Sequence, residues 1–335
     1  MNDAVRWQSP AKDGISRFET LKKRHLIKRS VRDYLHGQGF IEIDMPLLVK
    51  GATPDTHIDS FEVGDLYLVT STEYQIKRME IGGFDKCYTL TQNFRQGDTG
   101  RYRNPEFTML EWARVGETLA DIETDMEQML IRAHKDLGGS DILEYQGHKI
   151  DISTPWKRMS VRDAVESYTP AKLPDFTLDS FRQAVEDAGI KVKDEWKNDQ
   201  VFLFTVLLDH VQQFLGFDKP VFIQDWPKFL TSSAKESEGG QYVERSELFI
   251  AAVELSDGFP SLMSYERQQQ TFAEQNARRL EEGKSIVSLD EKYLSAMREG
   301  MPSGAGMALG FDRLVMVLTD RPDIASVLAY SWDEL

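Results

Sequence analysis

The stretch from Phe94 to Trp112, FRQGDTGRYRNPEFTMLEW, concentrates residue types that could act on a charged ligand. Arg95, Arg101 and Arg103 share a short segment with Asp98 and two glycines. Arginine is permanently charged and can donate two parallel hydrogen bonds to a carboxylate or a phosphate. The segment therefore predicts either a site for an anion or, as the plainer alternative, a hairpin with a solvated charged tip.

Two carboxylates form a second candidate group. Glu247 and Glu254 lie in a segment with strand character, YVERSELFIAAVELSDGF, and a pair of carboxylates can hold a divalent cation. On one straight strand, residues seven apart point to opposite faces. The two glutamates could share a site only if the chain bends near Ala251 and Ala252. The alternative is that each carboxylate faces solvent.

A run of small residues precedes a third candidate. Glycines and other small residues extend from Gly300 to Gly310, and Arg313 follows at the start of an apolar helix. Glycines let a backbone approach a ligand closely, and an arginine at a helix start can contact a phosphate or a ring face. Such a run alone does not identify a site.

These residues need elements to position them. The flanks of the arginine segment, TLTQNF and EFTMLEW, alternate as strands do and predict a hairpin. Residues 21–35 show helical spacing, and Gly37 and Gly39 end that helix. The next segment alternates up to Pro46, which indicates an edge strand. This helix and strand could form a dimer surface or an ordinary surface edge.

The segment LYLVTSTEYQIKRMEIGG changes from a strand pattern to a helix pattern, with Ser71, Thr72 and Glu73 at the change. Glu73 could be a helix-cap residue or a ligand-binding one. The turn-rich residues 51–65 before it carry His57 and Asp59, and could be a loop near a ligand or a plain surface loop.

Further helices follow. Residues 121–137 have helical spacing, and residues 156–235 contain three short helical segments separated by proline-rich and charged turns. That block could be a helical insertion or a small subdomain.

Composition limits the classes of function. A chain of 335 residues with 41% hydrophobic residues can bury a large core, and its net charge of −15 disfavours extended contact with nucleic acid. The single cysteine, Cys87, excludes an internal disulfide and fits a small core residue better than a nucleophile. The longest apolar run, Val201–Leu208, is too short to cross a bilayer, so we expect a cytoplasmic location.

Taken in order, the helix with its proline-ended strand, the arginine hairpin and the terminal GMALGFDRL segment resemble motifs one, two and three of class II aminoacyl-tRNA synthetases. NPEFTMLEW, TSTEYQIKR and GMPSGAGMALGFDRL, with the two glutamates, resemble the lysyl branch, and within it the truncated paralogues that attach β-lysine to elongation factor P. The resemblance covers about residues 20–335.

The resemblance implies an α+β fold with a mainly antiparallel sheet flanked by helices. It implies one catalytic domain over residues 1–335, with residues 156–236 as a helical insertion within it. An anticodon-binding domain is not expected, since it would need on the order of a hundred more residues before the first helix.

By analogy, the resemblance also implies ATP and Mg²⁺ as cofactors. The substrate carboxylate would attack the α-phosphorus in line, with no protein nucleophile. Arg95 and Arg313 would be the catalytic residues. Arg95 would contact the α-phosphate and the substrate carboxylate, Arg103 would lie near the outer phosphates, and Phe107 and Arg313 would enclose the adenine. Asp98 and Asn104 would complete the ATP site, and Glu247 and Glu254 would hold the magnesium. The amino-acid site would comprise Ser71, Glu73, Arg95, Glu111, Ala113, Asp257, Ser261 and Ala308, with Glu73 taking the substrate amine.

Several positions depart from the lysyl pattern. Gly97 stands where the branch often has a glutamate that reads the adenine, and the adjacent Asp98 is the open candidate to replace it. Ala113 stands in place of a tyrosine. The branch's ELANGFHEL reads VELSDGFPSL here, so Asp257 replaces an asparagine and Ser261 replaces the carboxylate that would face the lysine ammonium. These losses should weaken binding of a lysine-like cation by about 2–5 kcal/mol. An amine of other length or branching stays open.

The function expected from the resemblance is an ATP-dependent ligase that adenylates an amino-acid-like substrate and transfers it to an acceptor other than tRNA. The first candidate acceptor is a lysine of elongation factor P. The alternatives are a small amine or a carrier protein in a biosynthetic pathway, and a catalytically silent paralogue that acts as a regulator. We expect a homodimer with no membrane partner.

Overall fold

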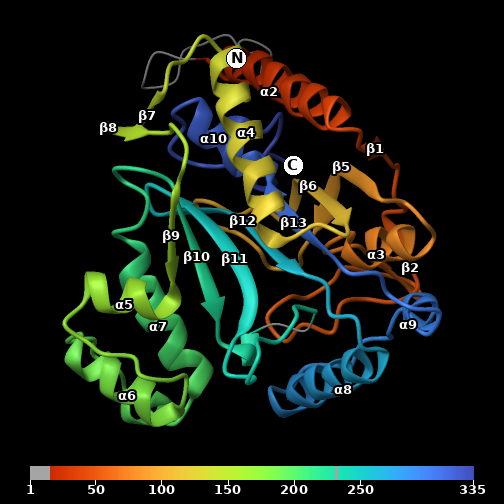
Figure 1. The fold of residues 1–335 in the computed structure, drawn as a ribbon, viewed down its shortest axis with the longest axis vertical. Helices are drawn as coiled ribbons and strands as arrows, with labels where there is room; N and C mark the ends of the chain where they lie inside the picture. The colour runs from red at the N-terminus through yellow and green to blue at the C-terminus, as the bar shows by residue number, and fades with distance from the viewer. Residues whose placement is uncertain (1–15, 231–232) are drawn as a thin grey trace.

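The computed structural model describes residues 16–230 and 233–335. Its centre is an eight-stranded sheet with the order β1-β5-β6-β13-β12-β11-β10-β9 (Figure 1). In that order the strands are Ile41–Glu42, Lys86–Phe94, Glu106–Val115, Gly304–Gly310, Val253–Pro260, Val243–Ile250, Val221–Trp226 and Lys157–Ser160. Only β1 with β5 and β9 with β10 run parallel, so the prediction of an α+β fold with a mainly antiparallel sheet is confirmed.

Two smaller sheets and several helices surround this sheet. The smaller sheets are β2 (Leu48–Val49), β4 (Leu66–Leu68) and β3 (Glu62–Val63), and the pair β7 (Ile142–Tyr145) and β8 (His148–Asp151). The helices are α2 (Arg17–Gly37), α3 (Glu73–Ile81), α4 (Leu119–Asp136), α5 (Val161–Tyr168), α6 (Leu178–Asp187), α7 (Gln200–Gln212), α8 (Tyr265–Glu281), α9 (Glu291–Met297) and α10 (Phe311–Leu318). Short 3₁₀ turns lie at Asp194–Trp196, Lys228–Leu230, Ala325–Val327 and Trp332–Glu334. None of these sheets is the barrel of an anticodon-binding domain.

The main core lies on one face of the large sheet, under α2, α4 and α10. Alternation along β6 turns Leu110 and Trp112 into this core, while Glu111 and Ala113 point to the opposite face. A capping box of Thr118 with Asp121 begins α4. The face opposite the main core is therefore left to α3, α9 and the functional side chains.

The predicted hairpin is present, since β5 and β6 pair from Lys86 with Arg114 to Phe94 with Glu106. Its connecting loop uses Gly97 in the left-handed backbone region, with φ of 81°. The predicted edge strand is also present, because β1 lies at one end of the sheet order and ends before Pro46.

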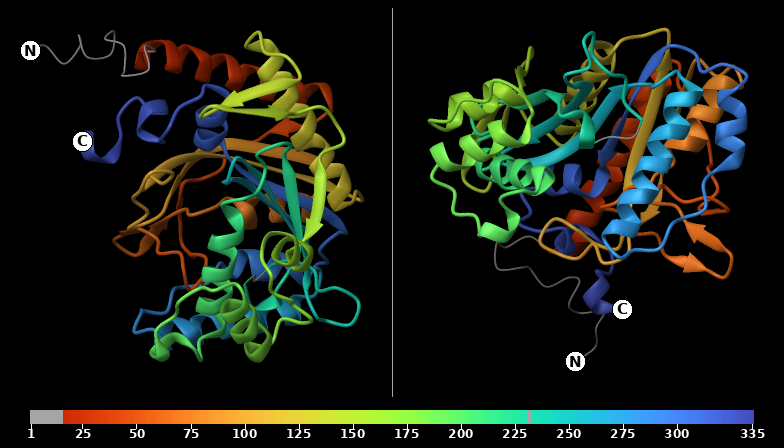
Figure 2. Two further views of the ribbon diagram at one scale, coloured as in Figure 1. Left: turned by 90° about the vertical axis from the view of Figure 1, so that its left-hand side faces the viewer. Right: turned by 90° about the horizontal axis from the view of Figure 1, so that it is seen from below.

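The three predicted helices between residues 156 and 235 are α5, α6 and α7, and they enclose a core of their own. They lie at the opposite end of the molecule from α2 (Figures 1 and 2). The predicted range 156–236 for a helical insertion is too wide at both ends, because it includes β9 and β10 of the main sheet. Neither strand was predicted from the sequence. β9, with the sequence KRMS, is a polar strand at the edge of the sheet, and β10 is a buried strand of only six residues. None of the described helices is long and apolar enough to cross a membrane.

Candidate active site

A cavity of about 320 Å³ opens on the sheet face opposite the main core. Its wall combines the hairpin loop, α3, strands β6, β12 and β13, and the loop around residues 53–58. All but one of the residues predicted for the site line it: Ser71, Glu73, Arg95, Asp98, Arg103, Asn104, Phe107, Glu111, Ala113, Glu254, Asp257, Ser261, Ala308 and Arg313. The exception is Glu247.

Strand register orders the floor of the cavity. Glu111, Ala308 and Asp257 are direct partners across β6, β13 and β12, and the next row consists of Ala113, Gly306 and Phe259. The six-residue step along β6 from Phe107 to Ala113 corresponds to about 20 Å. The cavity thus has an arginine end, formed by Arg95, Phe107 and Arg313, and a far end, formed by Lys77, Glu80, Ala113, Phe259 and Ser261.

At the arginine end, the Arg95 guanidinium lies 5.1 Å from the Phe107 ring centre. Its Nε donates one long hydrogen bond of 3.4 Å to the Thr70 carbonyl. No carboxylate lies within ion-pair distance of Arg95 among residues 16–230 and 233–335. Burial lowers the pKa of Arg95, and Asp98 and Glu254 oppose that effect. An anion bound here would supply the missing partner.

Arg313 completes this end from α10. Its Nε donates to the Tyr102 carbonyl at 3.1 Å, and Nη1 donates to the Glu254 carbonyl at 2.9 Å. The Glu254 carboxylate is 3.5 Å away. These contacts hold the guanidinium on the cavity wall, close to Arg95, whose pKa it also lowers.

Of the other polar residues in this loop, some line the cavity and others contact the C-terminal segment. Arg103 is exposed at the mouth and pairs with Asp98 at 3.0 Å. Arg101 does not line the cavity; its Nε donates to the Pro322 carbonyl. The Asn104 amide donates to the Glu106 carbonyl and accepts from the Trp332 backbone, so its two polar atoms hold the loop rather than face a ligand.

The bend between Glu247 and Glu254 lies where the sequence analysis required it. β11 and β12 are joined by Ala251 and Ala252, with φ of 46° and 64°. An extra residue, Leu255, forms a bulge in β12, because Phe249 pairs with Glu254 while Leu248 pairs with Ser256. The turn and the bulge together place Glu247, Glu254 and Asp257 on the same face of the sheet.

Arg245, which the sequence analysis missed, neutralises two of these carboxylates. Its Nη2 lies 2.7 Å from Glu247 and its Nε donates to Asp257 at 2.8 Å. Glu247 is buried beside Arg245 and does not reach the cavity wall. Burial raises the pKa of both Glu247 and Asp257, Arg245 lowers it, and Glu254 raises it further. Arg245 could have been predicted from the sequence, because residues two apart on one strand, such as Arg245 and Glu247, point to the same face.

The residues present fit a magnesium ion shared with a ligand. Among the described residues, no group of three or more acidic, histidine or cysteine side chains could hold a metal ion alone. Mg²⁺ typically takes one or two carboxylates together with substrate phosphates. Glu254, on the cavity wall, meets that requirement together with substrate phosphates, whereas Glu247 is buried beside Arg245 and does not line the cavity.

Glu111 is buried and fixes the start of α3. Its carboxylate accepts hydrogen bonds from the Ser71 hydroxyl and from both the backbone N–H and the hydroxyl of Thr72. Burial raises the pKa of Glu111, and these hydrogen bonds lower it. An acidic group suits a helix N-terminus, so Glu111 positions Glu73, the first residue of the helix.

Glu73, predicted to take the substrate amine, already has a partner in the protein. The Lys77 ammonium lies 2.6 Å from its carboxylate and 5.3 Å from the Phe259 ring centre. Lys77 is buried and lines the cavity, and the sequence analysis missed it. The pair could have been predicted from the sequence, because residues four apart on one helix, such as Glu73 and Lys77, are neighbours.

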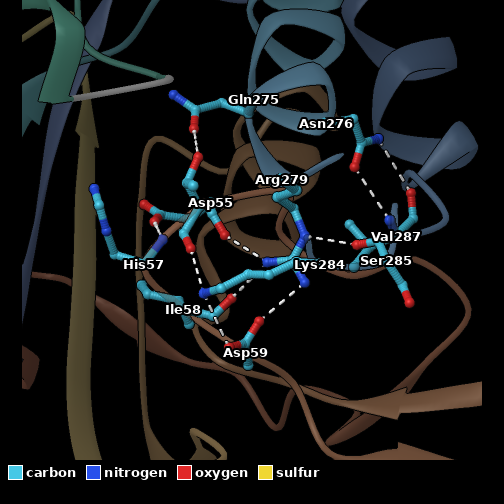
Figure 3. A network of polar contacts seen from close by, with 11 residues as sticks. Asp55, His57, Ile58, Asp59, Gln275, Asn276, Arg279, Lys284, Ser285 and Val287 are labelled. Atoms are coloured by element: carbon cyan, nitrogen blue, oxygen red, sulfur yellow. Dashed lines mark hydrogen bonds and ion pairs between the residues drawn. The ribbon is translucent and has the colours of Figure 1, made fainter. Parts of the chain in front are cut away.

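The loop around His57 and Asp59 closes one side of the cavity through Asp55 and Ile58. Arg279 of α8 donates to the Asp55 carbonyl and pairs with Asp59, while Lys284 donates to the Thr56 carbonyl and pairs with Asp59 (Figure 3). Of the two alternatives for this loop, the structure favours a loop beside the site, and Asp59 anchors it.

Sequence comparisons agree with this geometry. Residues 15–334 match the family model of the tRNA synthetases class II (D, K and N). The lysine–tRNA ligases of Thermosynechococcus vestitus, Chromohalobacter salexigens and Moorella thermoacetica are 35%, 33% and 31% identical over 93%, 92% and 92% of this chain. The chain spans only 63%, 62% and 64% of the length of these relatives.

Proposed function

We propose, on the premise that this chain belongs to the class II tRNA synthetases (D, K and N), that its cavity activates an amino acid with ATP and passes the acyl group to an acceptor other than tRNA. The observation that carries this proposal is Arg95, a cavity arginine without an ion-pair partner among the described residues. A site for one or more anionic groups explains why that charge is kept there.

In the proposed first step, an oxygen of the substrate carboxylate attacks the α-phosphorus of ATP and pyrophosphate leaves. Arg95 binds the α-phosphate and the substrate carboxylate, and so positions the reacting atoms and stabilises their charge. Arg313 and Phe107 hold the adenine, with Asp98 at its edge, while Asn104 supports the loop that carries these residues. Arg103, exposed at the mouth, contacts the outer phosphates. Magnesium bound by Glu254, with Glu247 buried behind the cavity wall, would neutralise charge on the leaving pyrophosphate.

In the second step, an amine of the acceptor attacks the acyl carbon of the adenylate, an amide forms, and AMP and a proton leave. The net charge of −15 disfavours RNA as the acceptor. The resemblance to the paralogues that modify elongation factor P makes a lysine of that protein the first candidate, with a small amine or a carrier protein as the alternative. The chain would act as a dimer through α2 and β1.

The test is ATP–pyrophosphate exchange with a panel of lysine, β-lysine, ornithine and neutral amino acids, followed by transfer to purified elongation factor P. We expect exchange with at least one member of the panel. Binding of an amino acid without exchange would favour the regulatory alternative. Exchange without transfer to elongation factor P would move the search to small amines and carrier proteins.

A further inference from the structure

The loop of residues 53–59, between β2 and β3, has neither helix nor strand of its own. Thr53, Asp55 and Ile58 of this 53–59 loop line the cavity. Backbone groups that are removed from water need hydrogen-bond partners, and an irregular loop must find them elsewhere in the molecule. The residues that supply these partners therefore set the shape of this side of the cavity.

The first of these partners is Arg279, in the last turn of α8 (Figure 3). Arg279 is buried, and its Nη1 donates to the carbonyls of Asp55 at 2.9 Å and Ile58 at 3.2 Å. Its Nη2 donates to the Asp59 carboxylate at 2.9 Å, and its Nε donates to the Ser285 carbonyl at 2.9 Å. The planar guanidinium has enough donors to reach all four acceptors at once. Arg279 thus holds the loop at three residues.

The second partner is Lys284, which follows α8. Its Nζ donates to the Thr56 carbonyl at 2.7 Å and to the Asp59 carboxylate at 3.1 Å. Burial raises the pKa of Asp59, but hydrogen bonds from Lys284 and Arg279 bring it below its usual range. The Asp59 carboxylate is therefore ionised at neutral pH and pairs with both cations.

Both ends of the loop contact neighbours of Arg95. At one end, the Asp59 carbonyl accepts a hydrogen bond of 2.7 Å from the backbone N–H of Gln96, the residue after Arg95. At the other end, the Thr70 hydroxyl donates to the Thr53 hydroxyl at 3.3 Å. The Thr70 carbonyl in turn accepts the 3.4 Å hydrogen bond from the Arg95 Nε. Arg95 is thus connected to α8 through both ends of the loop.

We propose that Arg279 is a positioning residue, which holds Arg95 in place for a bound anion by way of the 53–59 loop. Arg279 does not line the cavity, so it acts only through the loop. The inference rests on the proposed function, in which the anion is the α-phosphate of ATP. Without Arg279, the carbonyls of Asp55 and Ile58 lose their donor. The loop should then rearrange and release its contacts beside Arg95.

Amide hydrogen exchange tests this connection without any enzymatic reaction. We expect Arg279→Met to speed hydrogen exchange in peptides that cover residues 52–60 and also in those that cover residues 94–98. The second group contains the Gln96 amide, whose acceptor lies on the loop. Lys284→Met, at a partly exposed position, removes fewer contacts and should show the same pattern to a smaller extent.

Arg114→Met is the matched control for the loss of a buried arginine. Arg114 is also buried, and its guanidinium donates two hydrogen bonds of 2.7 Å to Asp125 on α4, away from the cavity. The control should lose stability, but its effect on hydrogen exchange should not be concentrated at residues 52–60 and 94–98. All variants are compared at a temperature at which circular dichroism shows them to be folded.

ATP binding and kinetics give a second readout. Calorimetric titration with ATP and Mg²⁺ should give a Kd about tenfold higher in Arg279→Met than in the wild type, because the phosphate meets a displaced Arg95. In ATP–pyrophosphate exchange, KM for ATP should rise in the same way. A purely structural role would reduce only the amount of folded enzyme, and so would lower the apparent kcat with KM unchanged. Arg114→Met should keep the wild-type Kd and KM.

The outcomes separate this inference from the proposed function. Faster hydrogen exchange confined to residues 52–60, faster exchange spread over the whole chain, or an unchanged Kd for ATP in Arg279→Met would overturn the inference. Normal ATP–pyrophosphate exchange kinetics in that variant would overturn it and leave the proposed function standing. If the wild type binds ATP but exchanges pyrophosphate with no amino acid, the proposed function is wrong, and a Kd that depends on Arg279 would still support the inference.

Discussion

At the arginine end of the cavity, Arg95 makes a 3.4 Å hydrogen bond to a carbonyl and a ring contact, but no ion pair with any of the described residues. Toward the far end, by contrast, Lys77 is paired with Glu73 at 2.6 Å, and Glu111, between the two ends, accepts three hydrogen bonds. The first set of charges leaves a place for the anionic ligand that we propose. The second is largely completed within the protein, and Glu80 is its exception. The proposed nucleotide site therefore relies on charges that the protein leaves open, and the proposed amino-acid site on charges that the protein mostly pairs internally.

The largest expected effect comes from removing Arg95, which has no ion-pair partner among the described residues. Arg95→Ala should lower ATP–pyrophosphate exchange by about 10²–10³-fold or more, because the α-phosphate loses its charged partner. Folding should be intact, since Arg95 makes one long side-chain hydrogen bond. Arg101→Ala, on the same loop but outside the cavity, is the control and should retain exchange. Near-normal exchange in Arg95→Ala would show that the nucleotide site is assigned to the wrong arginine.

A smaller effect, on stability, is expected between the two ends. Arg245→Met should reduce the free energy of unfolding by about 3–5 kcal/mol at pH 7.5, because Glu247 and Asp257 lose their buried counter-charge. The loss should be smaller at pH 5 than at pH 7.5, since burial raises the pKa of both carboxylates and a protonated carboxyl group needs no counter-charge. Urea denaturation at the two pH values measures both effects. An equal loss at both would mean that charge is not the cause.

Local patterns were enough to predict the hairpin and the turn into α3, because each depends on alternation or spacing within a few residues. The bend near Ala251 was only a condition for Glu247 and Glu254 to share a site, and the structure meets that condition. Arg245 and Lys77 could have been found in the same way, from their spacing to Glu247 and Glu73. Glu80 could not. In sequence it is an ordinary acidic residue near a helix end, and only the packing of α3 over β5 and β6 buries it.

The smallest expected effect concerns Glu80, the carboxylate at the far end that has no hydrogen-bond partner for its Oε1 atom among the described residues. Glu80→Leu should stabilise the unliganded protein by about 1 kcal/mol, because it removes a buried carboxylate without a partner among the described residues. Burial raises the pKa of Glu80 in the folded protein to about 7, above the ordinary value of 4.5, so the folded wild type holds its proton longer than the unfolded chain and loses stability as pH rises between those values. The gain from leucine should therefore be larger at pH 8 than at pH 5, as thermal unfolding can show. A variant less stable than the wild type at pH 8 would indicate that the carboxylate has a partner within the protein.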